Sequence, residues 1–210
     1  MKNLFIDTAS GRVIIAITDD KEVISIRNEA SDHQLSTRIM PLIDTVFQEA
    51  KITPKDIDVI YVVTGPGSFT GVRIGVTVAK TMAWALHKNI IPLSELELLA
   101  TTPFTGDFAV SLIDARRDAS FAGIYDQHGR AYLRDRYITN DDLVLQIPAN
   151  SQVSYISYDT SSRFDVVEPQ VDLMKMIHRH QNDTVCHPHQ VKPEYLKLTE
   201  AEENLRKAQS

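Results

Sequence analysis

Short blocks of apolar residues alternate with polar turns along the first half of the chain, and this pattern predicts a small α/β unit. Apolar runs at residues 4–6, 13–18 and 23–27 predict three strands, because turn-forming residues such as Gly11 and Asp19 separate them. Apolar residues then recur at every third or fourth position over residues 32–50, which predicts a helix. Runs at residues 57–63 and 90–93 predict two further strands on either side of a second helix at residues 70–87.

The first predicted helix contains a proline. Ser31 or Asp32 is expected to cap its start. Pro41 then removes one backbone hydrogen bond, so we expect either a kink at this residue or a helix that begins late.

The same order of elements begins again in the second half. Residues 109–113, 120–125, 131–138 and 153–158 predict strands, and residues 173–178 predict a weak helix. Asp7 and Asp114 each end the first strand of their copy. We therefore expect a first lobe at residues 1–103, a reduced second lobe at 104–198 and a polar tail at 199–210.

Two tandem copies of strand, strand, strand, helix and strand form the layout of the actin and sugar-kinase superfamily, whose lobes resemble ribonuclease H. The expected fold class is therefore α/β, with two ribonuclease H-like lobes of which the second is reduced.

Composition narrows the kind of protein. The chain has 210 residues, a net charge of −6 and a single cysteine, Cys186, so it has no intramolecular disulfide. Its apolar runs are too short to span a membrane, and its N-terminus lacks a signal-peptide core. We therefore expect a cytoplasmic protein. A protein that holds nucleic acid alone usually presents clustered lysines and arginines, and no such cluster is present here.

A glycine-rich segment at residues 65–75 separates the buried strand from the second helix. Backbone amides in such a loop can converge on an anion at a helix N-terminus, so Gly65, Gly67, Ser68 and Thr70 are candidates to face a nucleotide or another anion. The spacing matches neither the P-loop nor the dinucleotide-binding pattern. The alternative is a tight turn whose glycines allow close packing.

The second helix is apolar over most of its surface. Gly71, Gly75, Ala79 and Ala83 recur at every fourth position and form a smooth stripe. A helix that is apolar nearly all round is either central or part of an interface. Arg73 lies near the helix start, where a cation opposes the helix dipole, which indicates a carboxylate partner for it, in this chain or on another subunit.

Other candidate chemistry is sparse. Asp7 and Asp114 could hold a metal–nucleotide complex at strand ends, or they could cap the turns that follow. No two histidines are four residues apart and no nucleophile motif is present, so proteolysis is not supported. A late cluster could bind zinc or nickel, or could be a solvated region; it comprises His178, His180, Cys186, His187 and His189. We expect no catalytic residues and no dedicated metal site.

The glycine-rich segment from Gly65 to Gly75 resembles the signature loop of the TsaB (YeaZ) family. Residues 6–9, 113–117 and 193–197 resemble other blocks of this family in the same order. The resemblance implies a two-lobed, glycoprotease-like subunit of the machinery that forms threonylcarbamoyladenosine beside the tRNA anticodon. It implies partnership with the catalytic paralogue TsaD and with the ATPase TsaE, and a homodimer when the chain is alone.

The resemblance further implies a dimerisation and activating role without a cofactor of the chain's own, since ATP and a divalent metal serve the partner subunits. Contact with tRNA would be mainly through the complex. We expect the interface on the two long helices, at Leu35, Ile39, Leu42, Ile43, Val46, Gly71, Arg73, Ile74, Gly75, Val78, Ala79 and Met82.

The alternative is a stand-alone ATPase or kinase of the same fold. Such enzymes bind the adenosine through glycine-rich contacts in the second lobe. No glycine follows Gly129, which favours the subunit interpretation.

Overall fold

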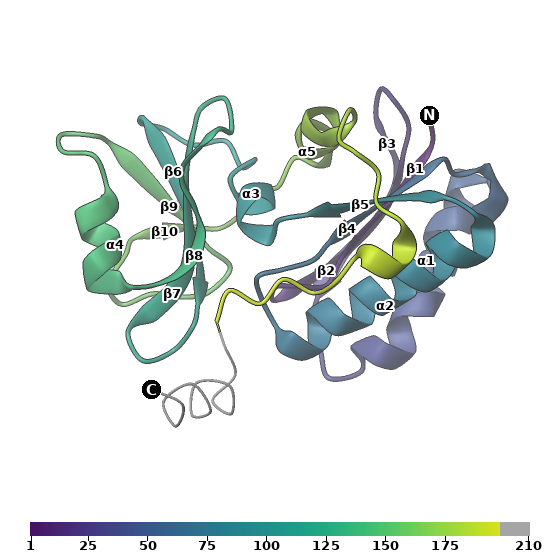
Figure 1. The fold of residues 1–210 in the computed structure, drawn as a ribbon, viewed down its shortest axis with the longest axis horizontal. Helices are drawn as coiled ribbons and strands as arrows, with labels where there is room; N and C mark the ends of the chain where they lie inside the picture. The colour runs from purple at the N-terminus through teal and green to yellow at the C-terminus, as the bar shows by residue number, and fades with distance from the viewer. Residues whose placement is uncertain (198–210) are drawn as a thin grey trace.

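Two five-stranded sheets, one in each lobe, form the framework of the computed structural model, which describes residues 1–197 (Figure 1). The first sheet has the order β3-β2-β1-β4-β5. Its strands are β1 (Asn3–Asp7), β2 (Arg12–Thr18), β3 (Val23–Ala30), β4 (Val59–Val63) and β5 (Asn89–Leu93). Strand β2 runs antiparallel to β1 and β3, whereas β1, β4 and β5 are parallel.

Helices cover both faces of the first sheet. Helices α1 (Leu35–Ala50) and α2 (Phe69–Leu86) lie on one face, and α5 (Leu173–His180) lies on the opposite face (Figure 1). Strands β1 and β4 are consequently buried along their whole length. Burial on both sides explains why these two strands are continuous apolar runs rather than alternating ones.

The second sheet repeats the topology of the first. Its order is β10-β9-β6-β7-β8, with the same parallel and antiparallel pairings about the central strand β6. Its elements are β6 (Phe108–Asp114), β7 (Ala119–Asp126), β8 (Ala131–Thr139), α4 (Asn140–Gln146), β9 (Val153–Ile156) and β10 (Val166–Val167). The tandem α/β fold expected from the sequence is therefore present.

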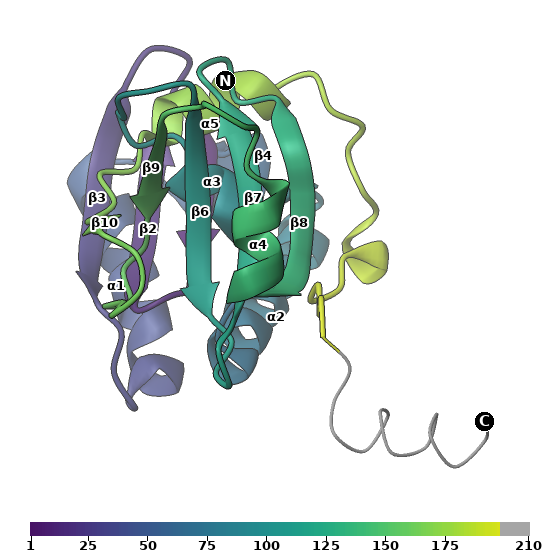
Figure 2. The same ribbon diagram turned by 90° about the vertical axis from the view of Figure 1, so that its left-hand side faces the viewer.

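The second lobe is the smaller copy. Helix α4 corresponds to α1 but has seven residues, and Leu143 is its one buried side chain. Within residues 1–197, no helix separates β9 from β10, where α2 separates β4 from β5 in the first lobe. Figure 2 shows α4 covering the face of this sheet that points away from the first lobe.

Helix α1 begins later than the sequence pattern predicts. It starts at Leu35, and its N-cap residue Gln34 makes no capping bond through its side chain. The expected cap at Ser31 or Asp32 is wrong, because Asp32 closes a turn before the helix by accepting a 2.9 Å bond from the Gln34 amide. Pro41 still lies inside the helix, which begins before it, so the late start expected as an alternative to a kink does not remove the proline from the helix.

Helices α3 (Glu95–Leu99) and α4 were not predicted. Both are too short to show a helical period in the sequence. Helix α3 lies between the two lobes (Figure 1) and is capped by the Ser94 hydroxyl, which accepts a bond from the Glu97 amide. Two short 3-10 helices, η1 (Pro54–Asp56) and η2 (Pro188–Gln190), complete the described elements.

After the second sheet the chain returns to the first lobe. Leu173, Met176 and Ile177 of α5 and the later Val191 belong to the core of the first sheet. Cys186 forms a backbone bridge with Ile90 in β5. Part of the span 104–198, expected to be second lobe, therefore completes the first lobe instead.

The last described residues, 191–197, form a segment that we call the C-terminal strap. The Glu194 amide donates a 2.7 Å bond to the Thr64 carbonyl at the end of β4. The Lys197 ammonium lies 4.5 Å from the centre of the Tyr137 ring on β8. The strap therefore runs from the first lobe to the second, as the yellow trace in Figure 1 shows. None of the described helices is long and apolar enough to cross a bilayer.

Candidate functional site

The glycine-rich loop packs directly on the turn that follows β1. The Ser68 amide donates a 2.7 Å bond to the Ala9 carbonyl, and the Thr8 hydroxyl donates a 2.8 Å bond to the Gly71 carbonyl. A Cβ atom at Gly67 would lie 2.0 Å from the Ala9 carbonyl oxygen. The loop therefore uses glycine for close backbone packing, and it lies next to Asp7 because residues 8 and 9 follow that aspartate.

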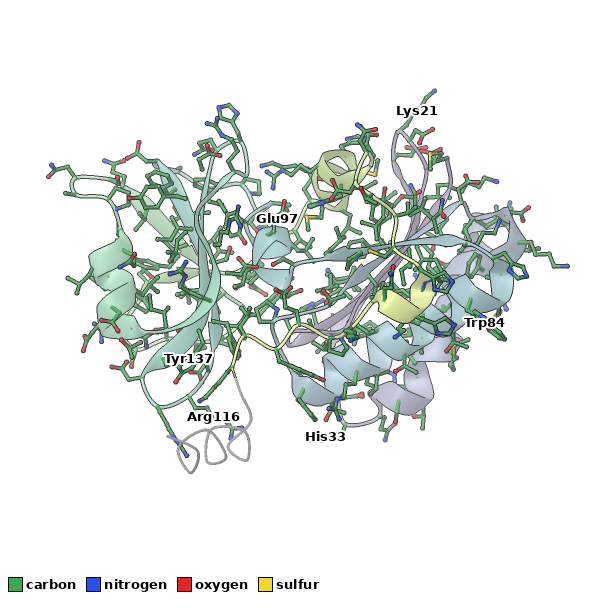
Figure 3. All side chains as sticks on the ribbon, in the orientation of Figure 1. Lys21, His33, Trp84, Glu97, Arg116 and Tyr137 are labelled. Atoms are coloured by element: carbon green, nitrogen blue, oxygen red, sulfur yellow. The ribbon has the colours of Figure 1, made fainter. Side chains whose placement is uncertain are left out.

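The loop also forms one wall of a cleft between the lobes. The cleft encloses about 620 Å³ and is lined on the first lobe by Ser10, Gly67, Ser68, Thr70 and the start of α1 and α2. The opposite wall comes from the second lobe and comprises Leu112, Ile113, Asp114, Phe121, Tyr158 and Asp159. His33 also lines the cleft, and Figure 3 shows His33 on the first lobe and Arg116 on the second, at the lower side of the view.

The loop residues expected to face an anion divide into two groups. Gly67, Ser68 and Thr70 line the cleft, whereas Gly65 is buried beneath the C-terminal strap, with its Cβ position 2.8 Å from the Glu194 carbonyl oxygen. The Ser68 hydroxyl accepts a 3.2 Å bond from the Gly71 amide and so caps α2. The amide and hydroxyl of Ser68 are thus both used within the chain.

Carboxylates dominate the charge of the cleft wall. Asp114 accepts a 2.9 Å bond from the Arg116 amide, and Asp159 accepts a 2.8 Å bond from the Asp114 amide. The Asp114 bond is that of a turn cap, which is one of the two interpretations of Asp114, whereas the Asp159 bond joins two distant segments of the second lobe. The described part of the chain contains no group of three histidine, cysteine or acidic side chains that could hold a metal ion.

Asp7 does not reach the cleft. It is fully buried, and one of its carboxylate oxygens accepts a 2.8 Å bond from the Ala9 amide. The arrangement matches that of Asp114 with Arg116 in the second lobe. Asp7 thus serves as a turn cap, which corrects the suggestion that it faces a nucleotide.

A second buried carboxyl group, Glu95, lies beside Asp7. Burial raises the pKa of Asp7, and it raises the pKa of Glu95 still further because the negative charge of Asp7 adds to the effect. Among the described residues, the second oxygen of Asp7 has no hydrogen-bond donor, and the Ser10 hydroxyl is the group that faces Glu95. The two carboxyl groups are both fully buried, and one proton shared between them would relieve the repulsion of their charges. The sequence pattern gave no signal for this pair, since Glu95 precedes a short unpredicted helix.

The residues expected at an interface also divide into two groups. Seven of them are buried in the core of the first lobe or against β1, and a partner cannot reach their side chains: Leu35, Ile39, Ile43, Val46, Gly71, Gly75 and Ala79. The Cβ position of Gly75 lies 2.2 Å from the Thr8 hydroxyl oxygen. The stripe of small residues on α2 therefore packs against the chain's own central strand, which corrects its interpretation as a contact between subunits.

The remaining five positions are at least partly exposed. Leu42, Ile74, Val78 and Met82 pack against the edge of the core and leave part of their surface open, and Arg73 is exposed. Three further large apolar side chains are exposed on the same two helices, namely Met40, Phe69 and Trp84. These eight residues define what we call the α1–α2 face.

The late histidines are dispersed. His180 contacts Glu97 at 3.0 Å and Asp183 at 2.7 Å, whereas His178 lies 3.2 Å from the Asp20 carbonyl. His187 and His189 stack on each other near η2. The structure therefore does not gather the cluster into one site.

Comparison with known proteins assigns the family. The family model of TsaD, tRNA N6-adenosine threonylcarbamoyltransferase, matches residues 23–204. The tRNA threonylcarbamoyladenosine biosynthesis protein TsaB of Bacillus subtilis is 30% identical over 224 residues, covering 96% of this chain and 96% of that protein. A tRNA N6-adenosine threonylcarbamoyltransferase from Persephonella marina is 29% identical over 113 residues, covering 46% of this chain and 33% of its own.

Two solved structures from Pseudomonas aeruginosa share the fold. One is YeaZ, with a TM-score of 0.72, and the other is a protein described as similar to peptidase YeaZ, with a TM-score of 0.78. Each is 21% identical and covers 93% of this chain and 99% of its own. The nearly full-length match to the Bacillus protein and the match to the TsaD model agree with this fold, and this chain belongs to the TsaB (YeaZ) family of tRNA threonylcarbamoyladenosine biosynthesis proteins.

Proposed function

We propose that this chain is the non-catalytic dimerisation and activating subunit of a cytoplasmic complex that forms threonylcarbamoyladenosine on tRNA. Its partner would be a TsaD-type transferase subunit, with a TsaE-type ATPase acting alongside. In the absence of the transferase subunit, the chain would form a homodimer. The likeness to both TsaB and TsaD supports this proposal, because two related chains can pair through equivalent helices as two identical chains do.

The observation that carries the proposal is the α1–α2 face. Phe69 is 47% exposed and Trp84 is 60% exposed, near the two ends of the helix that carries the partly open Ile74, Val78 and Met82. Large apolar side chains gathered on neighbouring helices are a mark of protein interfaces. A protein partner on this face would remove them from water.

The cleft supports a role without catalysis. Asp114 and Asp159 of the cleft accept bonds from backbone amides of the chain, and both the amide and the hydroxyl of Ser68 bond within the chain. ATP and a divalent metal would accordingly serve the partner subunits. Activation would then be a population shift, in which this chain binds the active form of the transferase subunit more tightly than the inactive form.

A reconstituted modification assay tests the proposal. Purified TsaD-type and TsaE-type subunits, ATP, threonylcarbamoyl-adenylate and tRNA would be combined with and without this chain. We expect modification to require it. Full modification without this chain would contradict the proposal, and ATP turnover by this chain alone would favour the kinase alternative.

A variant of the α1–α2 face sharpens the test. Val78→Lys keeps an aliphatic stem on the core and projects an ammonium into the face. It should weaken binding to the TsaD-type subunit about tenfold or more while the chain stays folded. Leu145→Lys is the matched control, because Leu145 is 78% exposed on α4 of the other lobe.

A further inference from the structure

Arg73 is held in one orientation on the surface of α2. Its Nε group donates a 2.7 Å bond to the Tyr195 hydroxyl, and its guanidinium carbon lies 3.7 Å from the centre of the Phe69 ring. The Phe69 and Tyr195 rings stack with their centres 5.2 Å apart. The three side chains thus form one exposed cluster, although Tyr195 comes from the distant C-terminal strap.

The strap that supplies Tyr195 is anchored on both sides of the cluster. The Glu194 amide bonds the Thr64 carbonyl immediately before the glycine-rich loop, and Lys197 contacts Tyr137 of the second lobe. Val191, at the start of the strap, is only 3% exposed. Tyr195 is therefore a fixed acceptor for Arg73.

Among residues 1–197, no partner occupies the two terminal amino groups of Arg73. Its hydrogen bond within the described residues uses Nε alone, and no carboxylate among those residues forms an ion pair with it. A planar guanidinium fork binds a carboxylate or phosphate through two parallel bonds. Because aromatic stacking and the Tyr195 bond already restrict the side chain, little conformational entropy remains to be lost on binding.

The surroundings favour a single carboxylate over a nucleic-acid backbone. The chain carries a net charge of −6, and the neighbouring cleft presents Asp32, Asp114 and Asp159. Such a surface repels a polyanion, whereas it leaves one exposed cation free to meet one acidic side chain. Arginine and aromatic residues together are also the commonest anchors of protein interfaces. Phe69 and Arg73 moreover belong to the α1–α2 face.

We propose that Arg73 binds an aspartate or glutamate of the TsaD-type subunit, and that Tyr195 is a positioning residue that aims Arg73 at it. This inference rests on the proposed function. It makes the C-terminal strap part of the interface, because the strap fixes the geometry of a contact made by α2. Folding of the C-terminal strap and binding of the TsaD-type subunit would therefore stabilise each other.

A double-mutant cycle tests the inference. The affinity of wild type, Arg73→Ala, Tyr195→Phe and the double variant for the TsaD-type subunit would be measured at two salt concentrations. Arg73→Ala should weaken binding about tenfold or more and reduce the salt dependence, and Tyr195→Phe should weaken it a few-fold. The double variant should bind like Arg73→Ala, because the Tyr195 hydroxyl acts through Arg73.

Control variants separate the outcomes. Lys80→Ala removes another cation from α2 and should bind normally, and Arg73→Lys should lose part of the affinity because lysine lacks the fork.

Unchanged binding by Arg73→Ala, with Val78→Lys defective, would overturn this inference and leave the proposed function intact. Additive losses in the double variant would overturn the positioning role. Weaker tRNA binding by the assembled complex, with subunit affinity unchanged, would assign Arg73 to a phosphate instead. Absence of binding by the wild-type chain would defeat the proposed function itself.

Discussion

At the scale of single residues, the glycines of the loop are explained by individual atoms across from them. The Cβ position of Gly71 lies 2.1 Å from the Thr8 carbonyl oxygen, which is a backbone atom of the turn after β1. A backbone atom in a buried turn cannot move aside at small cost. This contact, rather than an anion, accounts for the glycine at residue 71.

Gly71→Ala should therefore destabilise the fold by about 1–3 kcal/mol through overpacking. Gly11→Ala is the matched control, because nothing lies within 4 Å of its Cβ position. Urea unfolding followed by circular dichroism would measure both variants. Equal stability of the two variants would show that the turn yields to the added methyl group.

The Asp7–Glu95 pair makes stability depend on pH. The raised pKa of Glu95 and of Asp7 means that the folded chain holds protons that the unfolded chain releases. The protons held by this pair stabilise the folded chain fully below the ordinary glutamate pKa of about 4.5. This contribution to the free energy of unfolding is lost as pH rises through the raised pKa values of the two carboxyl groups.

Glu95→Gln should thus gain stability relative to wild type as pH increases from 5 to 8, because an amide can donate to Asp7 without titrating. The expected change is at most about 1.4 kcal/mol per pH unit for one proton. Urea unfolding at several pH values would measure it. Glu22→Gln, which removes an exposed carboxyl, controls for net charge. A constant difference between wild type and Glu95→Gln would show that no proton is shared.

The roles of single residues were the hardest features to predict from the sequence. An aspartate that caps a turn, binds a metal or faces an anion looks the same in a single sequence. These roles differ in how deeply the side chain is buried and in which groups surround it. The sequence allows two of these roles for Asp7, and its partner Glu95 begins α3, two residues after the end of β5. Only the folded chain brings the two carboxyl groups together.

At the scale of elements, repeating apolar patterns predicted the long helices and most strands. Helices α1 and α2 and the strands of both sheets lie within a few residues of their predicted positions, apart from the two-residue β10, which was not predicted. Helices α3 and α4 escaped prediction because five and seven residues span too few turns to show a period. The stripe on α2 was located correctly, but periodicity does not say whether a smooth face meets a neighbouring strand or another subunit.

Helix α5 packs in a core that is built mainly from residues far from it in the sequence. Met176 is fully buried in the core of the first sheet, some 80 residues after β5. Met176→Ala should destabilise the protein by about 2–4 kcal/mol, because it leaves a cavity in that core. Leu145→Ala, on the exposed side of α4, should change stability by no more than about 0.5 kcal/mol. Chemical denaturation would measure both, and a small effect at Met176 would mean that α5 is not part of that core.

At the scale of the whole molecule, the two lobes are joined where the chain crosses between them. Thr101 and Thr102 accept bonds of 2.8 and 3.1 Å from the amides of Asp172 and Gln170, so the outgoing and returning segments are paired. Helix α3 adds Glu97, which contacts His180 and Arg179 of α5. Figure 3 places Glu97 between the two lobes.

The His180 contact should respond to pH. Its hydrogen bond to Glu97 raises the pKa of His180 above the usual value of about 6.5. The resulting stabilisation is present below that value and is lost as pH rises through the raised pKa. His180→Gln should consequently be less stable than wild type at pH 5.5, and the difference should shrink by pH 8.5. Thermal unfolding across this range would measure it, and a difference independent of pH would contradict a charged His180.

The tandem architecture of the whole molecule could be predicted because each lobe repeats the same order of strands. The return of residues 173–191 to the first lobe could not, since a short amphipathic helix carries no information about which sheet it will cover. Its destination depends on the paired crossing at Thr101 and Asp172, which is a contact between distant residues.

The return of α5 has a consequence for biosynthesis. During synthesis the N-terminus leaves the ribosome first. The five strands of the first sheet therefore emerge long before α5, the helix that covers one face of that sheet. Until residue 180 has left the exit tunnel, that face has no cover from its own chain and is open to chaperones or to aggregation. Nascent chains stalled after β10 should be trapped by a holdase or cleaved by protease, whereas chains stalled beyond the strap with the tunnel cleared should resist both. The order of synthesis thus leaves the first lobe incomplete until residues 173–191 have been made.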